Sequence, residues 1–320
     1  MTAYIFRRVM MGVLVIIIVT IILFLVMRLL PGDPLVVYLT QQEFSAAQYN
    51  PAQMEALRAK FGLDKNLFLQ YIDWMGGIFQ GDFGLSITTQ SSVAHLITTR
   101  IPVTLHLGIL AFLVGTILGI GFGIICAVRR GTWVDTVVTL VANIGITTPI
   151  FWAAILLIYL FGLQLRWLPV FGYTPPFEDF WLSTRQLIMP VFCMSLFMLA
   201  SNTRLTRSSM LEVTAQDYIR TAWSKGLRER VIVIRHTIKN GLIPVIANKG
   251  FQVANILGGS VLIETVFNIP GVGRLLTTAI TQHDYMIVQA GTLIVAVAVV
   301  TANILIDITY GWLDPRIRYD

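Results

Sequence analysis

A lysine and two side-chain amides interrupt an otherwise apolar stretch in the last third of the chain. Lys249, Gln252 and Asn255 follow one another at three-residue intervals, so a helix would place them on one face. Polar groups are costly in lipid, and a watery path or bonds to other helices explain such a stripe better than lipid contact. We predict that these residues line a watery pathway between helices or bond to neighbouring helices. The alternative for Lys249 is that its ammonium group extends to the membrane surface.

Two further groups of residues are candidates near the outer membrane surface. His106 lies about one turn inside the outer end of an apolar stretch and is predicted to belong to the same pathway. A second group combines a helix end with helix-breaking residues, and we predict an external gate or a receptor-facing turn there rather than an irregular loop. Its members are Glu264, Phe267, Pro270, Gly271 and Gly273.

Covalent chemistry is not indicated anywhere in the chain. The apolar stretches hold no HExxH motif, no Ser-Lys or Ser-His pairing and no paired aspartates. Cys126 and Cys193 lie among apolar residues without His or acidic neighbours at ligand spacing, so we expect inert buried thiols and no metal site. The sequence contains no G-x-x-x-x-G-K-[ST] motif, so we expect neither an ATP site of this kind nor a cofactor in this chain.

The composition indicates a lipid environment. The 320-residue chain is 56% hydrophobic and 12% charged, whereas roughly a quarter of the residues of a soluble domain are charged. The first apolar stretch is longer than the roughly 7 to 15 residues of a signal peptide core, so we expect a retained span. We predict an all-α membrane protein with six transmembrane helices at about 9–30, 101–128, 134–163, 186–206, 241–267 and 286–311.

The distribution of basic residues predicts the orientation. An even number of spans puts both termini on one side, and 14 of the 23 Lys and Arg residues fall on that same side. The positive-inside rule therefore predicts cytoplasmic N and C termini. Residues 204–239 alone carry eight basic and three acidic residues, which accounts for most of the net charge of +6 and argues against nucleic acid as a partner.

The predicted spans divide the chain into four regions. Residues 1–30 form the first span, 31–100 an external helical cap, 101–311 a five-helix core and 312–320 a cytoplasmic tail. Within the core, Gly115, Gly119 and Gly123 form a small-residue face, which suits either close packing within the chain or a dimer contact. Asp307 is predicted to form a structural pair near the end of the last span.

The 207–240 loop is predicted to be a helix-turn-helix that projects into the cytoplasm. A helix is expected from Glu212 to Ser224, followed by a left-handed Gly226 and a second helical run from Leu227 to Ile238. Tyr218, Ala222 and Trp223 are its predicted contact face. An amphipathic loop on the lipid surface and a DNA-binding helix-turn-helix are alternatives, but a docking element fits best because an exposed apolar stripe needs a partner.

This loop resembles the coupling motif of ABC importer permeases. The run Asp217–Gly226 (DYIRTAWSKG), followed by Asn240–Pro244, is similar to the version found in dipeptide, oligopeptide and nickel permeases. His106 departs from the acidic residue expected in that branch. Other motifs of the branch occur in the same order from end to end: Leu29–Pro34, Phe61–Asp64, Gly81–Gly84, Trp167–Pro169, Glu264–Phe267, Pro270–Arg274 and Leu313–Ile317.

The resemblance implies a type I ABC importer permease in a bacterial or archaeal cytoplasmic membrane. Such a subunit would form half of a channel with a second permease, two ATP-binding subunits that use ATP and Mg²⁺, and an extracytoplasmic substrate-binding protein. Residues implied to couple to the ATPase are Asp217, Tyr218, Arg220, Thr221, Ala222, Trp223, Lys225 and Gly226. The imported solute would be a peptide or a similar small molecule.

Two other classes of protein remain as alternatives. A gradient-driven transporter or channel would need carboxylates on an ion path, and Glu264 and Asp307 both lie near span ends. A membrane-embedded enzyme would need one of the catalytic arrangements that the spans lack.

Overall fold

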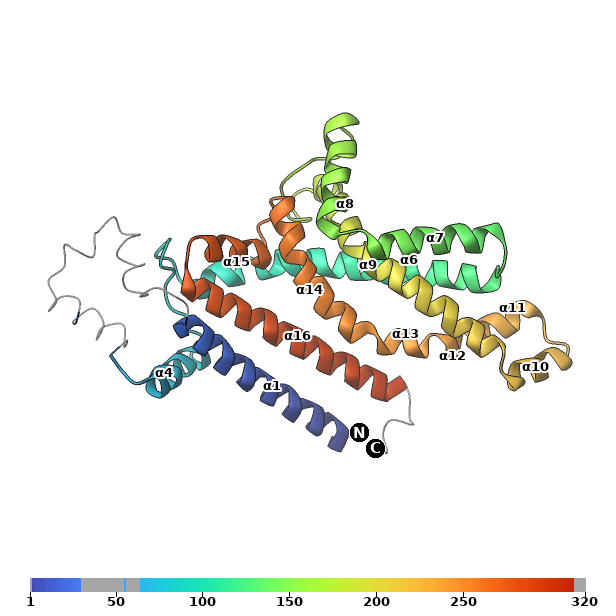
Figure 1. The fold of residues 1–320 in the computed structure, drawn as a ribbon, viewed down its shortest axis with the longest axis horizontal. Helices are drawn as coiled ribbons and strands as arrows, with labels where there is room; N and C mark the ends of the chain where they lie inside the picture. The colour runs from blue at the N-terminus through green and yellow to red at the C-terminus, as the bar shows by residue number, and fades with distance from the viewer. Residues whose placement is uncertain (1, 30–54, 56–63, 314–320) are drawn as a thin grey trace.

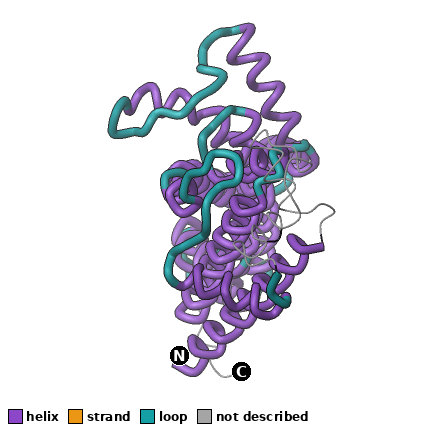
Figure 2. The backbone as a smooth tube through the Cα atoms, turned by 90° about the vertical axis from the view of Figure 1, so that its left-hand side faces the viewer, coloured by secondary structure: helices purple, strands orange, loops and turns teal. Residues whose placement is uncertain are grey.

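The chain folds into a bundle of helices from which one helical arm projects (Figures 1 and 2). The computed structural model describes residues 2–29, 55 and 64–313. Its longer helices are α1 (Thr2–Leu29), α4 (Leu67–Phe79), α6 (Ile101–Val128), α7 (Trp133–Thr147), α9 (Phe180–Thr214), α14 (Lys249–Val266), α15 (Val272–Thr281) and α16 (Tyr285–Leu313). The shorter ones are α5 (Val93–Thr98), α8 (Ile150–Leu157), η2 (Ile158–Gln164), α10 (Asp217–Ser224), α11 (Glu229–Val231), η3 (Ile232–Ile238), α12 (Lys239–Gly241) and α13 (Ile243–Ala247).

Four helical segments are long and apolar enough to cross a bilayer, and a bent pair could supply a fifth span. The four are Tyr4–Leu29, Val93–Val128, Phe180–Thr214 and Tyr285–Thr309. They match four of the predicted spans. The predicted span at 241–267 is divided at Leu242 and Asn248, and its role as a sixth span stays a prediction.

The predicted span at 134–163 is not straight. The axes of α7 and of the following α8–η2 segment differ by 106°, so α8 forms the projecting arm (Figure 2). Thr148 and Pro149 both have extended backbone angles at the bend. A proline disfavours helical geometry in the residue before it and has no N–H to continue the helix. The Thr148 hydroxyl and backbone N–H both donate to the Ile144 carbonyl, at 2.7 and 3.0 Å.

Helices α1 and α16 lie side by side in opposite directions, which places the start of α1 and the end of α16 at one end of the molecule (Figure 1). Arg8 Nη1 lies 2.9 Å from Asp307 Oδ2, and the Tyr4 hydroxyl donates to the Asp307 carbonyl. The predicted pairing of Asp307 is therefore confirmed. This end also carries α10 and α11, whereas α15 lies at the opposite end, so we call them the loop end and the α15 end. Cytoplasmic placement of the loop end stays a prediction.

The segment predicted to form an external cap is described in its second half only, and its location stays a prediction. Helix α4 confirms the helical pattern predicted at 67–79, whereas the pattern expected from Met54 to Phe61 lies outside the described residues, apart from Glu55. Helix α4 packs on the far end of α1, where the Tyr71 hydroxyl lies 2.8 Å from Thr20 Oγ1 and the Tyr71 ring stands edge-on to Phe24. The motifs at 30–34 and 314–317 also lie outside the described residues.

The small-residue face of α6 packs against α9. A Cβ atom added to Gly119 would lie 2.7 Å from Asn202 Cβ, and one added to Gly123 would lie 2.5 Å from Thr206 Cβ. The same close approach lets the Asn202 amide and the Thr203 hydroxyl donate to the carbonyls of Gly115 and Gly119, both at 3.2 Å. Packing within the chain, one of the two interpretations of this face, is thus observed.

Replacing Gly123 by Ala should separate α6 from α9. The added methyl group meets the Cβ of Thr206 and the carbonyl of Thr203, and overpacking of this kind costs about 1–3 kcal/mol. The thermal midpoint of the purified protein should therefore fall. Gly121→Ala is the matched control because nothing lies within 4 Å of its added Cβ. Equal midpoints for the two variants would contradict the packing described.

Candidate functional site

Two hollows lie along the contact between α9 and the α13–α14 segment. The hollow nearer the α15 end has a volume of about 420 Å³ and the one nearer the loop end about 730 Å³. On α9 their lining residues follow the helical repeat from Phe197 through Ser201 and Arg204 to Ser208. On the other side they run from Asn248 through Gln252 and Asn255 to Gly259 and Leu262. Both hollows therefore lie on one face of each helix, and together we call them the α9–α14 groove.

The groove changes in character along its length. Near the α15 end its walls are mainly apolar, with the amides of Gln252 and Asn255 and the hydroxyl of Thr148 as polar groups. Near the loop end the α9 wall presents Ser201, Arg204 and Ser208. No carboxylate is among the described residues that line either hollow. Such a surface can hold water and solvate a neutral or anionic solute, and it contains no nucleophile paired with a base.

Lys249 lies behind the groove, in a polar network that joins three helices. Its ammonium group donates to Thr116 Oγ1 on α6, Asn202 Oδ1 on α9 and Gln252 Oε1 on α14, at 3.1–3.2 Å. Gln252 Nε2 also donates to Asn202 Oδ1, at 2.7 Å. Lys249 retains 8% of its accessible surface, so the alternative of extension to the membrane surface is wrong. Three bonds use all three ammonium donors, which offsets the cost of burying the charge.

The structure divides the predicted pathway residues between two places. Gln252 belongs to both the network and the groove wall, while Asn255 is exposed in the groove and donates to the Phe251 carbonyl. His106 is half-buried elsewhere on α6, where its Nδ1 lies 3.1 Å from the Tyr173 hydroxyl. It lines neither hollow. Lys249, Gln252 and Asn255 therefore do not form one open stripe, and their role in a pathway stays a prediction.

The turn between α14 and α15 is built around a buried carboxylate. Glu264 is fully buried and accepts bonds from the Thr104 hydroxyl at 2.8 Å and the Arg274 backbone N–H at 3.0 Å. The second bond satisfies a free N–H in the first turn of α15. A Cβ atom on Gly271 would lie 2.3–2.6 Å from the Glu264 carboxyl group, and one on Gly273 would lie 2.6 Å from Val261 Cα. The two glycines are required because the carboxylate fills their side-chain space.

Most residues of the predicted gate or receptor-facing turn have little exposed surface. Glu264, Phe267, Gly271 and Gly273 are buried within the chain, and only Pro270 of the five is exposed. Helix-breaking residues predict the position of a turn but not its burial. Here the hydrogen bonds of the buried Glu264 carboxylate hold the neighbouring residues inside the chain. A role as a gate stays a prediction.

The 207–240 loop forms a small body of its own at the loop end (Figure 1). Gly226 has φ +74°, the Leu227 N–H donates to the Ala222 carbonyl at 3.4 Å and the Gly226 N–H to the Trp223 carbonyl at 2.9 Å. These are the two bonds of a Schellman motif, so the predicted left-handed terminus is confirmed. Two details differ, because the helix expected from Glu212 is interrupted at Ala215–Gln216 and the second run is mainly the π-helix η3.

Two of the three residues of the predicted contact face are exposed, and their role in a contact stays a prediction. Tyr218 and Trp223 are 45% and 47% exposed. Ala222 is instead buried with Ile219 and Ile232 in a cluster that holds α10 against η3. Four-residue spacing pairs residues on a helix but does not show which of two adjacent apolar stripes faces the rest of the chain.

The remaining predicted loop residues have clear positions. Asp217 opens α10 and lies 3.5 Å from Arg220 in an exposed ion pair, a type that contributes about 0–1 kcal/mol. Thr221 donates to the Asp217 carbonyl, and Lys225 precedes Gly226 as the C-cap. Asn240 Nδ2 donates to the Tyr218 hydroxyl at 3.0 Å and so connects α10 to α12. The side chains of Tyr218 and Thr221 are therefore held in place by hydrogen bonds within the loop.

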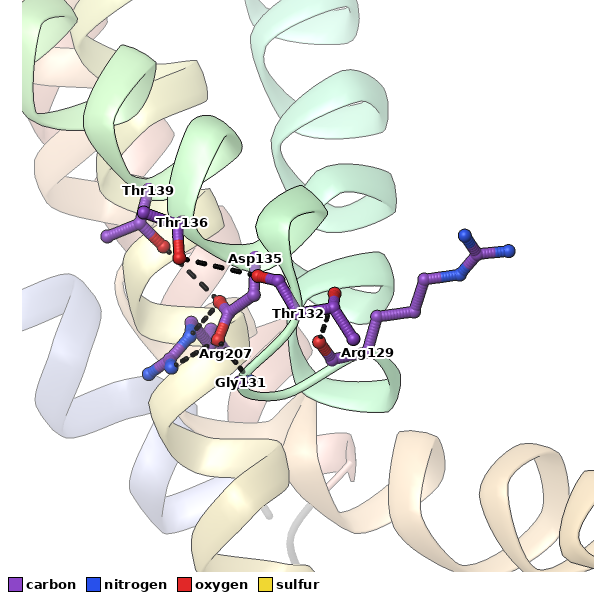
Figure 3. A network of polar contacts seen from close by, with 7 residues as sticks. All are labelled: Arg129, Gly131, Thr132, Asp135, Thr136, Thr139 and Arg207. Carbon is purple, nitrogen blue, oxygen red and sulfur yellow. Dashed lines mark hydrogen bonds and ion pairs between the residues drawn. The ribbon is translucent and has the colours of Figure 1, made fainter.

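A partly buried ion pair near the loop end was not predicted (Figure 3). Arg207 on α9 donates from Nε and Nη2 to the two carboxylate oxygens of Asp135 on α7, at 2.7 and 2.8 Å. The Gly131 N–H and the Thr139 hydroxyl complete the network. One signal was available, since Asp135 is the sole acidic residue in 83–177. This bidentate pair fixes the short turn between α6 and α7 against α9.

Comparison with known proteins identifies the family to which the chain belongs. The model of the binding-protein-dependent transport system inner membrane component matches residues 119–319, and that of the N-terminal part of such components matches residues 1–108. The chain belongs to this family. It is the permease subunit of a binding-protein-dependent ABC importer.

Relatives of the permease extend over its whole length. A putative peptide transport system permease protein of Brucella abortus (strain 2308) is 40% identical over 100% of both chains. The oligopeptide transport system permease protein AppB of Bacillus subtilis is 37% identical and the dipeptide transport system permease protein DppB of Alkalihalophilus pseudofirmus 35% identical, both over all of both chains. A chain of the MetNI methionine ABC transporter, solved in inward facing conformations, shares the fold at 14% identity, with a TM-score of 0.52 over 68% of the permease and 96% of that chain.

Cysteines placed in the α9–α14 groove of the permease should be accessible from water. We expect Ser201→Cys and Asn255→Cys to react with a water-soluble maleimide on the order of ten times faster than cysteines buried on the same helices. The reason is that both positions line the hollows of the groove, whereas the buried cysteines are covered by neighbouring helices. Labelling is followed by the mass of the protein over time.

Ser195→Cys on α9 and Ser260→Cys on α14 are the matched controls, because both side chains are at most 2% exposed. The experiment uses a background in which Cys126 and Cys193 are replaced by Ala. Labelling of the control cysteines as fast as the groove cysteines would contradict the groove as described.

Proposed function

We propose that this chain forms one half of the translocation pathway of a peptide importer, with the α9–α14 groove as its share of the wall. The observation that supports the proposal is the groove itself, which carries Ser201, Arg204 and Ser208 on its α9 wall and the amides of Gln252 and Asn255 on its α14 wall. A groove on one chain becomes a channel when a second permease covers it. The permease names of the relatives support a peptide as the solute.

The 207–240 loop supplies the connection to the energy source. Tyr218 and Trp223 are exposed on a loop whose inner side is fixed by Ile219, Ala222 and Ile232. Exposed aromatic residues on a rigid support are typical centres of a protein interface. We propose that they contact one of two ATP-binding subunits, which bind ATP and Mg²⁺ and hydrolyse the ATP, and that this chain has no ATPase site of its own.

The complete importer then consists of two permeases, two ATP-binding subunits and an extracytoplasmic substrate-binding protein in a bacterial cytoplasmic membrane. The loop end faces the cytoplasm, and the α15 end faces the binding protein. Nucleotide binding would switch the complex between inward-facing and outward-facing states. The test is ATP-dependent uptake of labelled peptide by the four reconstituted subunits with the binding protein. Uptake by this chain alone without ATP would contradict the proposal.

Removing the exposed aromatic rings should uncouple the ATPase from the permease. We expect Tyr218→Ala and Trp223→Ala each to lower ATP-dependent uptake at least about tenfold, because central aromatic contacts contribute about 2 kcal/mol or more to an interface. Co-purification of the ATP-binding subunits should fall in parallel. Trp133→Ala is the control, since Trp133 is 76% exposed at the same end but outside the loop. Equal uptake by all three variants would argue against the loop as the contact.

Gly226 should tolerate Asn better than Val. A residue with a side chain is destabilised by about 1–2 kcal/mol in the left-handed conformation that Gly226 adopts, with φ +74°. Asn is destabilised less than other residues, because its short polar side chain can form a hydrogen bond with the nearby backbone. Nothing lies within 4 Å of an added Cβ, so a collision cannot explain a loss. We expect Gly226→Val to reduce uptake strongly and Gly226→Asn to retain most of it. The same loss in both variants would show that backbone conformation is not the cause.

A further inference from the structure

A pocket at the α15 end of the molecule contains two arginines. It has a volume of about 300 Å³ and lies between the start of α6 and the outer side of α15. Arg100 is the residue before α6 and Arg274 is in the first turn of α15. Exposed hydroxyl groups of Thr88, Thr89 and Thr278 also line it. The pocket is separate from the α9–α14 groove, with which it shares no lining residue.

The two positive charges have no neutralising partner among the described residues. Arg100 and Arg274 line the same pocket, and neither forms an ion pair within the described part of the chain, unlike Arg8 and Arg207. Arg274 donates one bond to the Asn268 carbonyl, at 3.3 Å. Two like charges in a partly buried pocket repel each other, and a bound anion would remove this unfavourable interaction.

Two fully buried carboxylates in the segments around this pocket are already engaged by other groups. Glu264 accepts bonds from the Thr104 hydroxyl and the Arg274 backbone N–H, and it is fully buried. Asp284 is also fully buried and accepts bonds from the Ser86 hydroxyl and the Thr88 N–H, at 2.6 and 3.2 Å. Both therefore serve to hold the pocket walls together, and the guanidinium groups are left for an external anion.

We propose that this pocket receives an acidic side chain of the extracytoplasmic substrate-binding protein. The inference rests on the proposed function, which places the α15 end toward that protein. The volume suits one or two side chains, and guanidinium groups bind a carboxylate through paired, directional bonds. The hydroxyl-rich rim suits a protein surface in water better than lipid tails. Pro270, the exposed residue of the α14–α15 turn, lines the same pocket.

The backbone of Arg274 connects the proposed contact to the groove helix α14. The backbone N–H of Arg274 is bonded to Glu264 on α14, and the same helix carries Gln252 and Asn255 in the groove wall. A binding protein that engages Arg274 would therefore act on a turn that is bonded directly to the groove helix.

The test is binding of the substrate-binding protein encoded with this permease to the complete importer in nanodiscs. We expect the Arg100→Glu/Arg274→Glu double variant to raise the Kd at least about tenfold, because charge reversal turns attraction into repulsion. The dependence of Kd on NaCl should weaken in parallel, since fewer opposite charges are screened. ATP hydrolysis in the absence of the binding protein should be unchanged, which shows that the variant is folded and assembled.

Arg166→Glu is the matched control, because Arg166 is an exposed arginine outside the pocket in the segment between η2 and α9. A double variant with the wild-type Kd would overturn the proposal, as would an equal loss of affinity in the control. A wild-type importer that neither binds the binding protein nor takes up peptide with ATP would instead contradict the proposed function. The two failures are thus distinguishable.

Discussion

The close contact of α6 with α9 is the constraint on which the rest of the structure depends. Lipid tails are as apolar as leucine, so burying apolar surface gives helices in a bilayer little reason to associate. Here the association comes from close approach at Gly119 and Gly123 and from two side-chain bonds to the α6 backbone. One of those donors, Asn202, also accepts bonds from Lys249 and Gln252. The contact between α6 and α9 therefore also positions α14.

This arrangement explains why the groove lies between α9 and α14. Helix α14 is held to α9 by hydrogen bonds through Asn202 as well as by apolar contacts in the core cluster that includes Ile256 and Met194. Interhelical bonds in membranes contribute only about 0.6–2 kcal/mol each. By contrast, α7 is fixed to α9 by the partly buried bidentate pair of Asp135 and Arg207. The polar groups needed to attach α14 are the same ones that give the groove wall its polar character, and Gln252 serves both purposes.

Much of this could be predicted from the sequence, and the limits have physical causes. Local signals succeeded, since hydrophobic length gave four spans and Gly226 gave a left-handed helix end. Long-range pairings were missed, because Asp135 and Arg207 are 72 residues apart and nothing local relates them. The sequence also did not show which residues face the interior of the chain, since Ala222, Gly271 and Gly273 were expected at exposed positions and are buried. Helical spacing defines a face, but only the partner of that face decides whether it is buried.

Glycine has different roles at the two ends of the molecule. Gly226 is needed for its positive φ, with open space around its Cα, whereas Gly271 and Gly273 are needed because Glu264 and Val261 occupy the space of a side chain. The first requirement makes the 207–240 loop a turn of fixed shape, and the second fastens α15 to α14. Between them, α12, α13 and α14 form one run of helix broken only at Leu242 and Asn248. A displacement of the loop is therefore transmitted to the groove wall and the α14–α15 turn through consecutive backbone.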